Sequence, residues 1–306
     1  MINSRMLCLE CVIDILENKK HSHLVINELL DNYRYLEKRD RAFINRVCTG
    51  TIERCIEIDY IINAFSKVKV NKMNLLRISV YQIKYMDNVP STAICNEAVK
   101  IATKKGFRTL KGFVNGVLRN IDRNIENIEY PNKDSIEYLE IKYSMPAWII
   151  KKWIKDYSKE TTIKILEGFL DERKSISIRC NTNRIKIEDL VNEISADVKN
   201  ISKSIYCEDG LIIDGFDYLS KIKAFKEGLF YVQDESSMVC VDASGVNKDD
   251  YVIDVCAAPG GKSVSIALKL NETGTVDARD INEYKVGLIK ENINRMNLKN
   301  VIVKEW

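Results

Sequence analysis

A segment of small residues close to position 260 has the composition of a ligand-binding turn. Residues 254–263 read DVCAAPGGKS and follow the apolar run 251–253. Small residues and glycines let a ligand approach the backbone closely, and the amides that begin a helix attract polar or negatively charged groups. The segment therefore predicts a strand, a tight turn and a helix start around a ligand. The candidate cofactor-binding residues in it are Cys256, Ala257, Ala258, Pro259, Gly260, Gly261 and Lys262.

The spacing of this turn excludes two common nucleotide-binding loops. A phosphate-binding P-loop requires Gly-x-x-x-x-Gly-Lys-Ser/Thr, and Gly261-Lys262-Ser263 matches only its end. The first glycine of that pattern would fall at position 256, which is Cys256. The dinucleotide pattern Gly-x-Gly-x-x-Gly is also absent from the turn.

An acidic residue at the end of the next expected strand would complete such a site. Asp280 lies 24 residues after Cys256 and follows the strand expected at 275–279, whereas its competitor Asp277 falls inside that strand. This is close to the spacing at which an acid binds the hydroxyl pair of a ribose in nucleotide-binding folds. The turn, the helix start and the acid together suit an adenosine-type cofactor without a pyrophosphate, and S-adenosylmethionine is the natural candidate.

Two of these residues also have a purely structural interpretation. Asp280 could cap a helix that starts at Ile281, either instead of binding a ribose or in addition to it. Lys262 could pair with a carboxylate or simply remain solvated. The sequence leaves both alternatives open.

The chain divides into three regions, which predicts a multidomain fold. Residues 1–140 indicate an all-α helical bundle, residues 141–232 a small α+β linker domain, and residues 233–306 the start of a doubly wound α/β domain. Helices of the first region are expected from residue 4 and near 24–33, 38–55, 58–65, 73–86, 91–103, 109–121 and 134–140. In the second region, two helices around 149–154 and 159–171 precede strands at 175–180, 204–207, 211–214 and 229–232, with a helix at 188–194. In the third region, strands are expected at 251–255, 275–279 and from 300, with helices at 262–270 and 281–296.

Basic residues concentrate in one part of the helical region. The whole chain has a net charge of +3, but residues 100–123 alone carry seven lysines and arginines against one acid, Asp122. A local excess of this kind is typical of a surface that binds a polyanion such as RNA, although a solvated helix face is the alternative. The candidate phosphate-contacting residues are Lys104, Lys105, Arg108 and Arg119.

The cysteines and the apolar runs bear on the protein's environment. The nine cysteines are an odd number and mostly lie in apolar runs, which favours reduced thiols in a cytoplasmic protein. Cys8 and Cys11, with His21 and His23 downstream, could form a zinc site, but both cysteines fall in the apolar stripe of the first helix and are better interpreted as core residues. No apolar run reaches the length of a membrane span, and nothing in the sequence indicates a metal site or an oligomer, so we expect a soluble monomer.

Three segments in the second half of the chain carry a family resemblance. They are DVCAAPGGK at 254–262, FYVQDESS at 230–237 and IRCNT at 178–182. They resemble the cofactor-binding motif, the segment upstream of it and the R-x-N strand of the RNA cytosine carbon-5 methyltransferases of the NOL1/NOP2/Sun family. The resemblance implies a Rossmann-like methyltransferase domain, S-adenosylmethionine as cofactor and RNA as substrate.

Three segments in the first half resemble a different fold. They are DRAF at 40–43, GTIER at 50–54 and VNGVLR at 114–119. These segments are similar to the fold of the antitermination factor NusB, an RNA-binding helical domain. The combination of both resemblances implies a methyltransferase acting on 16S ribosomal RNA.

The family's mechanism implies two cysteines that this sequence does not place. By resemblance, one thiolate adds to carbon 6 of the cytosine, carbon 5 takes the methyl group, and a second cysteine assists elimination. In the family both cysteines follow the third strand, so Cys256 and Cys180 match neither position and we assign no catalytic residue. Asp277 and Arg279 also depart from the family, in which this strand is usually apolar.

The sequence therefore predicts a 16S ribosomal RNA cytosine-C5 methyltransferase that is truncated before its catalytic cysteines and is expected to be inactive alone. A parallel sheet needs several strands covered on both faces, and two complete β-α units with a third strand cannot supply them, so we expect a fragment, with a natural short variant as the alternative. Two other functions remain open. One is the same chemistry on transfer RNA; the other is a non-catalytic NusB-like protein that binds RNA or acts in antitermination.

Overall fold

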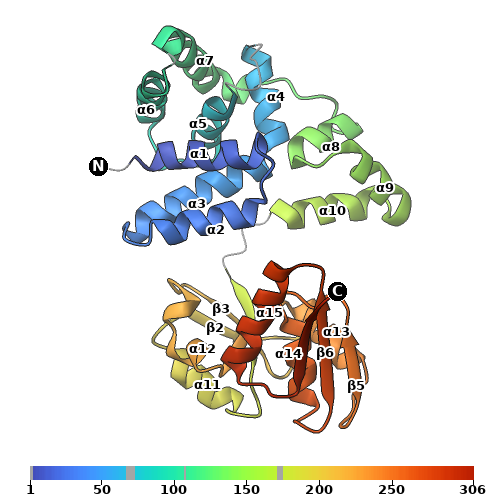
Figure 1. The fold of residues 1–306 in the computed structure, drawn as a ribbon. Helices are drawn as coiled ribbons and strands as arrows, with labels where there is room; N and C mark the ends of the chain where they lie inside the picture. The colour runs from blue at the N-terminus through green and yellow to red at the C-terminus, as the bar shows by residue number, and fades with distance from the viewer. Residues whose placement is uncertain (1–2, 67–72, 107, 171–174) are drawn as a thin grey trace. The chain divides into compact units, whose positions relative to one another are not determined.

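A computed structural model describes residues 3–66, 73–106, 108–170 and 175–306 of the chain. Figure 1 shows that the chain forms two compact units, Met1–Asp171 and Glu172–Trp306. The first unit is helical, and the second contains both of the sheets found in the described residues.

The regular secondary structure in the described residues of the first unit is entirely helical, as the sequence predicts. These described residues contain ten α-helices and two short 3₁₀ helices, η2 (Arg108–Leu110) and η3 (Ile125–Asn127). The α-helices are α1 (Ser4–Leu16), α2 (Ser22–Asn32), α3 (Lys38–Glu53), α4 (Cys55–Phe65), α5 (Met73–Tyr85), α6 (Ser91–Lys104), α7 (Lys111–Asn124), α8 (Ile136–Tyr143), α9 (Ala147–Tyr157) and α10 (Lys159–Leu170).

The core of this unit follows from helical spacing of apolar residues. In α1, the buried residues include Leu7, Cys8, Cys11 and Val12, which recur every three or four positions and share one face. Cys8 and Cys11 are thus core residues, as expected, and no group of three metal-ligating side chains was found in the described residues. Gly50 allows α3 to approach α5, because a Cβ there would lie within 2.3 Å of the Tyr81 ring.

A smaller core joins α8, α9 and α10 and is built around Leu139, Ile150 and Leu166. Beside it, the buried carboxylate of Glu57 on α4 accepts hydrogen bonds from Lys84, Tyr85 and Tyr130. These partners compensate the cost of burying a charge. Among the described helices, none is long and apolar enough to cross a membrane.

The second unit begins with a four-stranded antiparallel sheet in the order β2-β3-β1-β4. Its elements are β1 (Ile176–Cys180), α11 (Ile187–Ile194), β2 (Asn200–Lys203), β3 (Gly210–Asp214), η4 (Leu219–Lys221), α12 (Lys223–Lys226) and β4 (Phe230–Val232). The expected strand at 204–207 is wrong. The strand lies at Asn200–Lys203 instead, because Ser204 Oγ accepts the amides of Tyr206 and Cys207 and turns the chain.

A parallel sheet in the order β5-β6-β7 completes the second unit. Its elements are α13 (Glu235–Ala243), β5 (Tyr251–Asp254), α14 (Gly261–Lys269), β6 (Thr275–Asp280), α15 (Glu283–Met296) and β7 (Val301–Glu305). Helices α14 and α15 pack on the strands of this sheet (Figure 1). Val276 and Ala278 of β6 are buried in the core between the helices and the sheet. This strand–helix alternation with parallel pairing confirms the predicted α/β fold class.

Candidate functional site

The predicted turn lies between β5 and α14, at the carboxyl end of the parallel sheet. Neighbouring parts of the unit hold its backbone in place. The Ala257 amide donates to the Arg279 carbonyl oxygen (3.0 Å), and Asn292 Nδ2 donates to the Pro259 carbonyl oxygen (2.8 Å). The turn is therefore tied to both β6 and α15, which fixes the direction of its amides.

Gly260 is required by the backbone of this turn. Its φ is +104°, a region that residues with a side chain rarely adopt, and a Cβ would lie 3.5 Å from Ile289 Cα. Gly260 is also the N-cap of α14, and no side chain caps this helix. The start of α14 therefore presents its backbone amides to a ligand without a competing side-chain acceptor.

Asp280 is the last residue of β6 and faces the turn. Its carboxylate accepts the Ala258 amide on Oδ2 (3.0 Å) and the Ile281 amide on Oδ1 (2.8 Å), and Lys285 Nζ lies 3.2 Å from Oδ1. Hydrogen bonds from the Ile281 and Ala258 amides, and then Lys285, lower the pKa of Asp280. An ionised carboxylate has about four acceptor positions, so Asp280 can hold the turn and still accept from a ligand hydroxyl.

Asp280 does not cap the helix that follows it, so that structural alternative is wrong. Helix α15 starts at Glu283 rather than Ile281, and its N-cap is Asn282, whose side chain accepts the Lys285 amide (3.0 Å). The cap lies two residues later because Ile281 and Asn282 are not helical.

The remaining predicted residues differ in their surroundings. Lys262 is exposed and forms no ion pair with any described residue, so of its two alternatives the structure favours solvation. Cys256 is exposed as well. The sequence reasoning missed Asp254 and Ser263, whose side chains bond across the turn (Oγ to Oδ2, 2.7 Å), and Gln233, which donates to the Gly261 carbonyl oxygen (3.1 Å).

These features fit an adenosine-type cofactor. The helix start offers backbone amides that no side chain caps. The Asp280 carboxylate has one acceptor position left beside the Ala258 amide, the Ile281 amide and Lys285. The predicted cofactor residues are thus brought together at the ends of β5 and β6, which pair as neighbouring parallel strands.

Asp277 lies on the opposite face of β6 within a cluster of opposite charges. Its carboxylate is inaccessible to solvent and bonds to Arg279 (2.7 Å), Tyr251 (2.9 Å) and Lys304 (3.0 Å). These partners come from three adjacent strands, which explains how the strand tolerates charges at positions where an apolar residue would be usual. The Arg279 guanidinium, followed by Lys304 and Tyr251, holds the pKa of Asp277 well below its usual range.

Acid is expected to destabilise the second unit partly through Asp277. Its folded-state pKa lies below the unfolded value of about 3.9, so its stabilisation is complete above that pH and is lost as pH falls through the folded pKa. In Asp277→Asn this contribution is absent. The free energy of unfolding, measured with urea, should therefore decline less steeply between pH 5 and pH 2 for Asp277→Asn than for the unchanged chain. The exposed Asp197→Asn is the control, and equal declines for all three proteins would contradict the role of Asp277.

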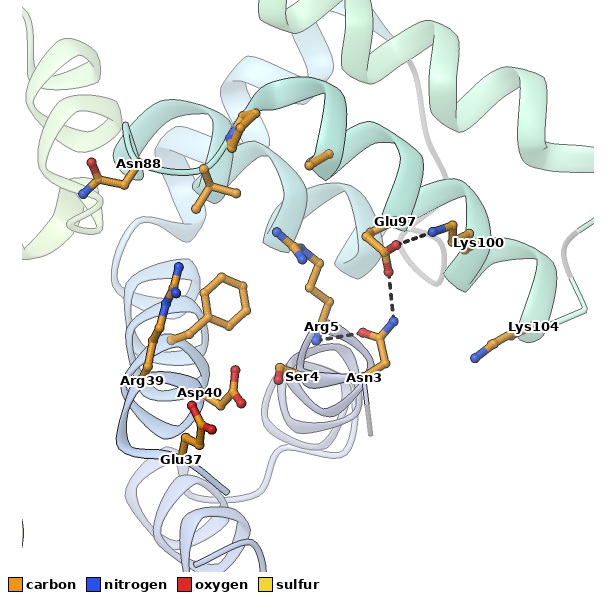
Figure 2. Close-up of a pocket in the computed structure, with 14 residues that line it drawn as sticks. Asn3, Ser4, Arg5, Glu37, Arg39, Asp40, Asn88, Glu97, Lys100 and Lys104 are labelled. Atoms are coloured by element: carbon orange, nitrogen blue, oxygen red, sulfur yellow. Dashed lines mark hydrogen bonds and ion pairs between the residues drawn. The ribbon is translucent and has the colours of Figure 1, made fainter. Parts of the chain in front are cut away.

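A cavity of about 740 Å³ opens in the first unit, where α1, α3 and α6 meet, and its charged lining includes the acids Glu37, Asp40 and Glu97. Figure 2 shows Arg5, Arg39, Lys100 and Lys104 around it, with Glu97 bonded to Lys100 and Asn3. Arg39 and Lys104 form no ion pair with any described residue. Phe43 forms part of the wall, and the Arg5 guanidinium lies 5.1 Å from the centre of its ring.

Of the three predicted RNA-contacting residues whose side chains the structure describes, one lines this cavity. Lys104 does, whereas Lys105 pairs with Glu10 (2.8 Å) and Arg119 is exposed with its Nε bonded to Asn115 (3.0 Å). The side chain of Arg108 lies outside the described part of the chain. Arg5 and Arg39 were missed because they are distant from residues 100–123 in sequence, and only the helix packing brings them to Lys104.

Three family models match the chain. Residues 3–123 match the NusB family, residues 145–217 the ferredoxin-like domain of RsmF/B-like methyltransferases, and residues 244–306 the 16S rRNA methyltransferase RsmB/F model. The structure agrees with the solved fold of PH0851 at a TM-score of 0.78 and 23% identity, covering 100% of this chain and 69% of that one. A methyltransferase homologue from Pyrococcus horikoshii matches at a TM-score of 0.50 and 22% identity, over 57% of this chain and 56% of that one.

Two curated relatives match almost the whole chain in sequence. The probable ribosomal RNA small subunit methyltransferase B of Bacillus subtilis is 33% identical over 303 residues, covering 96% of this chain and 66% of the relative. The ribosomal RNA small subunit methyltransferase B of Proteus mirabilis is 27% identical, covering 97% and 69%. The chain thus spans about two thirds of the length of these relatives. With its NusB domain, its ferredoxin-like domain and its match to the methyltransferase domain, the chain belongs to the RsmB/F family of 16S rRNA methyltransferases.

Proposed function

We propose that this chain is part of an enzyme that transfers a methyl group from S-adenosylmethionine to carbon 5 of a cytosine in 16S ribosomal RNA. The observation that carries the proposal is the turn 256–262 with Asp280 at its side, in a segment that matches the RsmB/F methyltransferase model. The names of the curated relatives support ribosomal RNA as the substrate class.

The chain's own residues would bind and orient the cofactor, which supplies an activated methyl group. Asp280 would accept a hydrogen bond from a ribose hydroxyl while it holds the Ala258 amide. The amides at the start of α14 would face polar groups of the cofactor, and Lys262, which is exposed and unpaired, would be available to a carboxylate.

The thiolate step of the proposed mechanism is not assigned to a cysteine of this chain. Cys180 is buried in β1, and burial raises its pKa to about 12, so it is a protonated thiol near neutral pH. Cys256 is exposed but belongs to the cofactor turn. The covalent cysteine–cytosine adduct therefore remains a proposal drawn from the family resemblance.

The helical unit would dock the RNA through its cationic residues. Lys104, Lys105, Arg108 and Arg119 are the proposed phosphate contacts, and the cavity beside Lys104 adds Arg5 and Arg39. The match of residues 3–123 to the NusB family supports this role. A ribosomal RNA substrate would place the protein in the cytoplasm.

The target of methylation can be tested in cells. Deleting the gene should remove one 5-methylcytosine from 16S ribosomal RNA, read by bisulfite sequencing, and restoring the gene should return it. Loss of a mark in transfer RNA with 16S ribosomal RNA unchanged would favour the transfer RNA alternative. Unchanged marks in both RNAs would contradict the methyltransferase proposal and favour a protein that only binds RNA.

A further inference from the structure

A buried chain of polar side chains connects the antiparallel sheet to the cofactor turn. The Tyr231 hydroxyl lies 2.7 Å from Ser265 Oγ, and Ser265 Oγ donates to Gln233 Oε1 (2.8 Å). Gln233 Nε2 then donates to the Gly261 carbonyl oxygen (3.1 Å), at the first residue of α14. All three side chains are less than 5% exposed, so water does not compete for these bonds.

The direction of every hydrogen bond in this chain is fixed by chemistry. The Gly261 carbonyl oxygen can only accept, so the amide nitrogen of Gln233 must face it and Oε1 must face Ser265. The single hydroxyl proton of Ser265 is then used on Oε1, so the Tyr231 hydroxyl has to donate to Ser265. The network has one satisfied arrangement, which gives Gln233 one orientation.

Gln233 is itself held by the antiparallel sheet. It follows β4 directly, and its backbone amide donates to the Ser177 carbonyl oxygen (3.2 Å) in β1. A Cβ at Gly261 would lie 3.7 Å from the Val232 carbonyl oxygen and 3.9 Å from Gln233 Cγ. The start of α14 therefore packs against the end of β4, and Gln233 is the side chain that bonds the two.

We propose that Gln233 is a positioning residue that sets the cofactor turn relative to the antiparallel sheet. The bond to Gly261 fixes the first turn of α14, and with it the Gly260 backbone and the amides that face the ligand. The identity of that ligand as S-adenosylmethionine rests on the proposed function, whereas the positioning of the turn does not depend on it.

The test compares Gln233→Leu with Tyr231→Phe in the 306-residue chain. Leucine fills a similar volume but removes the bond to Gly261, whereas phenylalanine removes one hydroxyl from the same network and leaves that bond in place. We measure S-adenosylmethionine affinity by calorimetry, amide hydrogen exchange of residues 257–264 by mass spectrometry, and the unfolding temperature. Gln233→Met is the second variant if Gln233→Leu does not fold, because methionine adapts to irregular space.

Gln233→Leu should weaken S-adenosylmethionine binding about tenfold, the factor that corresponds to about 1.4 kcal/mol. Exchange in residues 257–264 should accelerate by a similar factor, while Tyr231→Phe stays within twofold of the unchanged chain in both measurements. Faster exchange in Gln233→Leu without any cofactor binding by the unchanged chain would support the positioning role and count against the proposed cofactor. Unchanged exchange, or equal changes in Gln233→Leu and Tyr231→Phe, would overturn the inference.

Discussion

Asp280→Asn is expected to lower the affinity of the chain for S-adenosylmethionine by about 10- to 100-fold. One hydrogen bond from a ribose hydroxyl to a charged acceptor contributes about 1.5–3 kcal/mol, and every 1.4 kcal/mol is a factor of ten. The substitution also disturbs the free turn. Both carboxylate oxygens face backbone amides, of Ala258 and Ile281, so the new NH₂ group must oppose one of these donors.

Asp277→Asn is the matched control for this measurement. It makes the same chemical change on the same strand, but Asp277 bonds to Arg279, Tyr251 and Lys304 on the other face of the sheet. Calorimetry at neutral pH should show near-normal cofactor affinity for Asp277→Asn, provided that circular dichroism confirms a folded protein. If Asp280→Asn binds within threefold of the unchanged chain, Asp280 does not hold the ribose.

Replacing Lys104, Lys105, Arg108 and Arg119 together with alanine is expected to weaken binding to 16S ribosomal RNA and to flatten its salt dependence. The slope of log K against log salt is negative, and each lost phosphate contact makes it shallower by about 0.7 for single-stranded RNA. Losing four contacts therefore makes the slope shallower by about 3. The structure orders the four positions by availability. Lys104 lines the cavity between α1, α3 and α6 and forms no ion pair with any described residue, whereas Lys105 already pairs with Glu10, so Lys104→Ala should have the larger single effect.

The control for this experiment removes the same charge elsewhere. Lys186, Lys199, Lys226 and Lys248 are exposed residues of the second unit, and their joint replacement by alanine also changes the net charge by −4. The slope of log K against log salt is measured for each variant by filter binding of a 16S ribosomal RNA fragment at salt concentrations from about 50 to about 300 mM. Equal slopes for the two quadruple variants would show a general charge effect rather than a docking surface.

The sequence predicted the elements whose pattern is local. Helical spacing of apolar residues located the helices of the first unit, since burial of one face is a property of each helix by itself. Alternating strands and helices in residues 251–305 located the parallel sheet, and the same pattern placed Asp280 at the end of its strand. The strand expected at 204–207 was wrong because apolar residues alone do not reveal a turn made by Ser204.

In the candidate site, too, local patterns were predictable from the sequence, whereas contacts between distant residues were not. Residue types and spacing indicated the turn 256–262 and Asp280, because a ligand can approach the backbone closely only where several consecutive residues are small. The bonds that hold the site join residues distant in the chain: Asp280 to Ala258, Gln233 to Gly261, and Asn292 to Pro259. No local pattern encodes such pairs.

The amino-acid sequence by itself determined the fold class, the family and the position of the turn 256–262, because each rests on short motifs and on periodicity. Only the tertiary structure decided that Asn282 rather than Asp280 caps α15, that Arg279, Lys304 and Tyr251 bond to Asp277, and that Arg5 and Arg39 join Lys104 at one cavity. The physical reason is that hydrogen bonds and ion pairs depend on distances of about 3 Å between side chains, and the packing of helices and strands sets those distances.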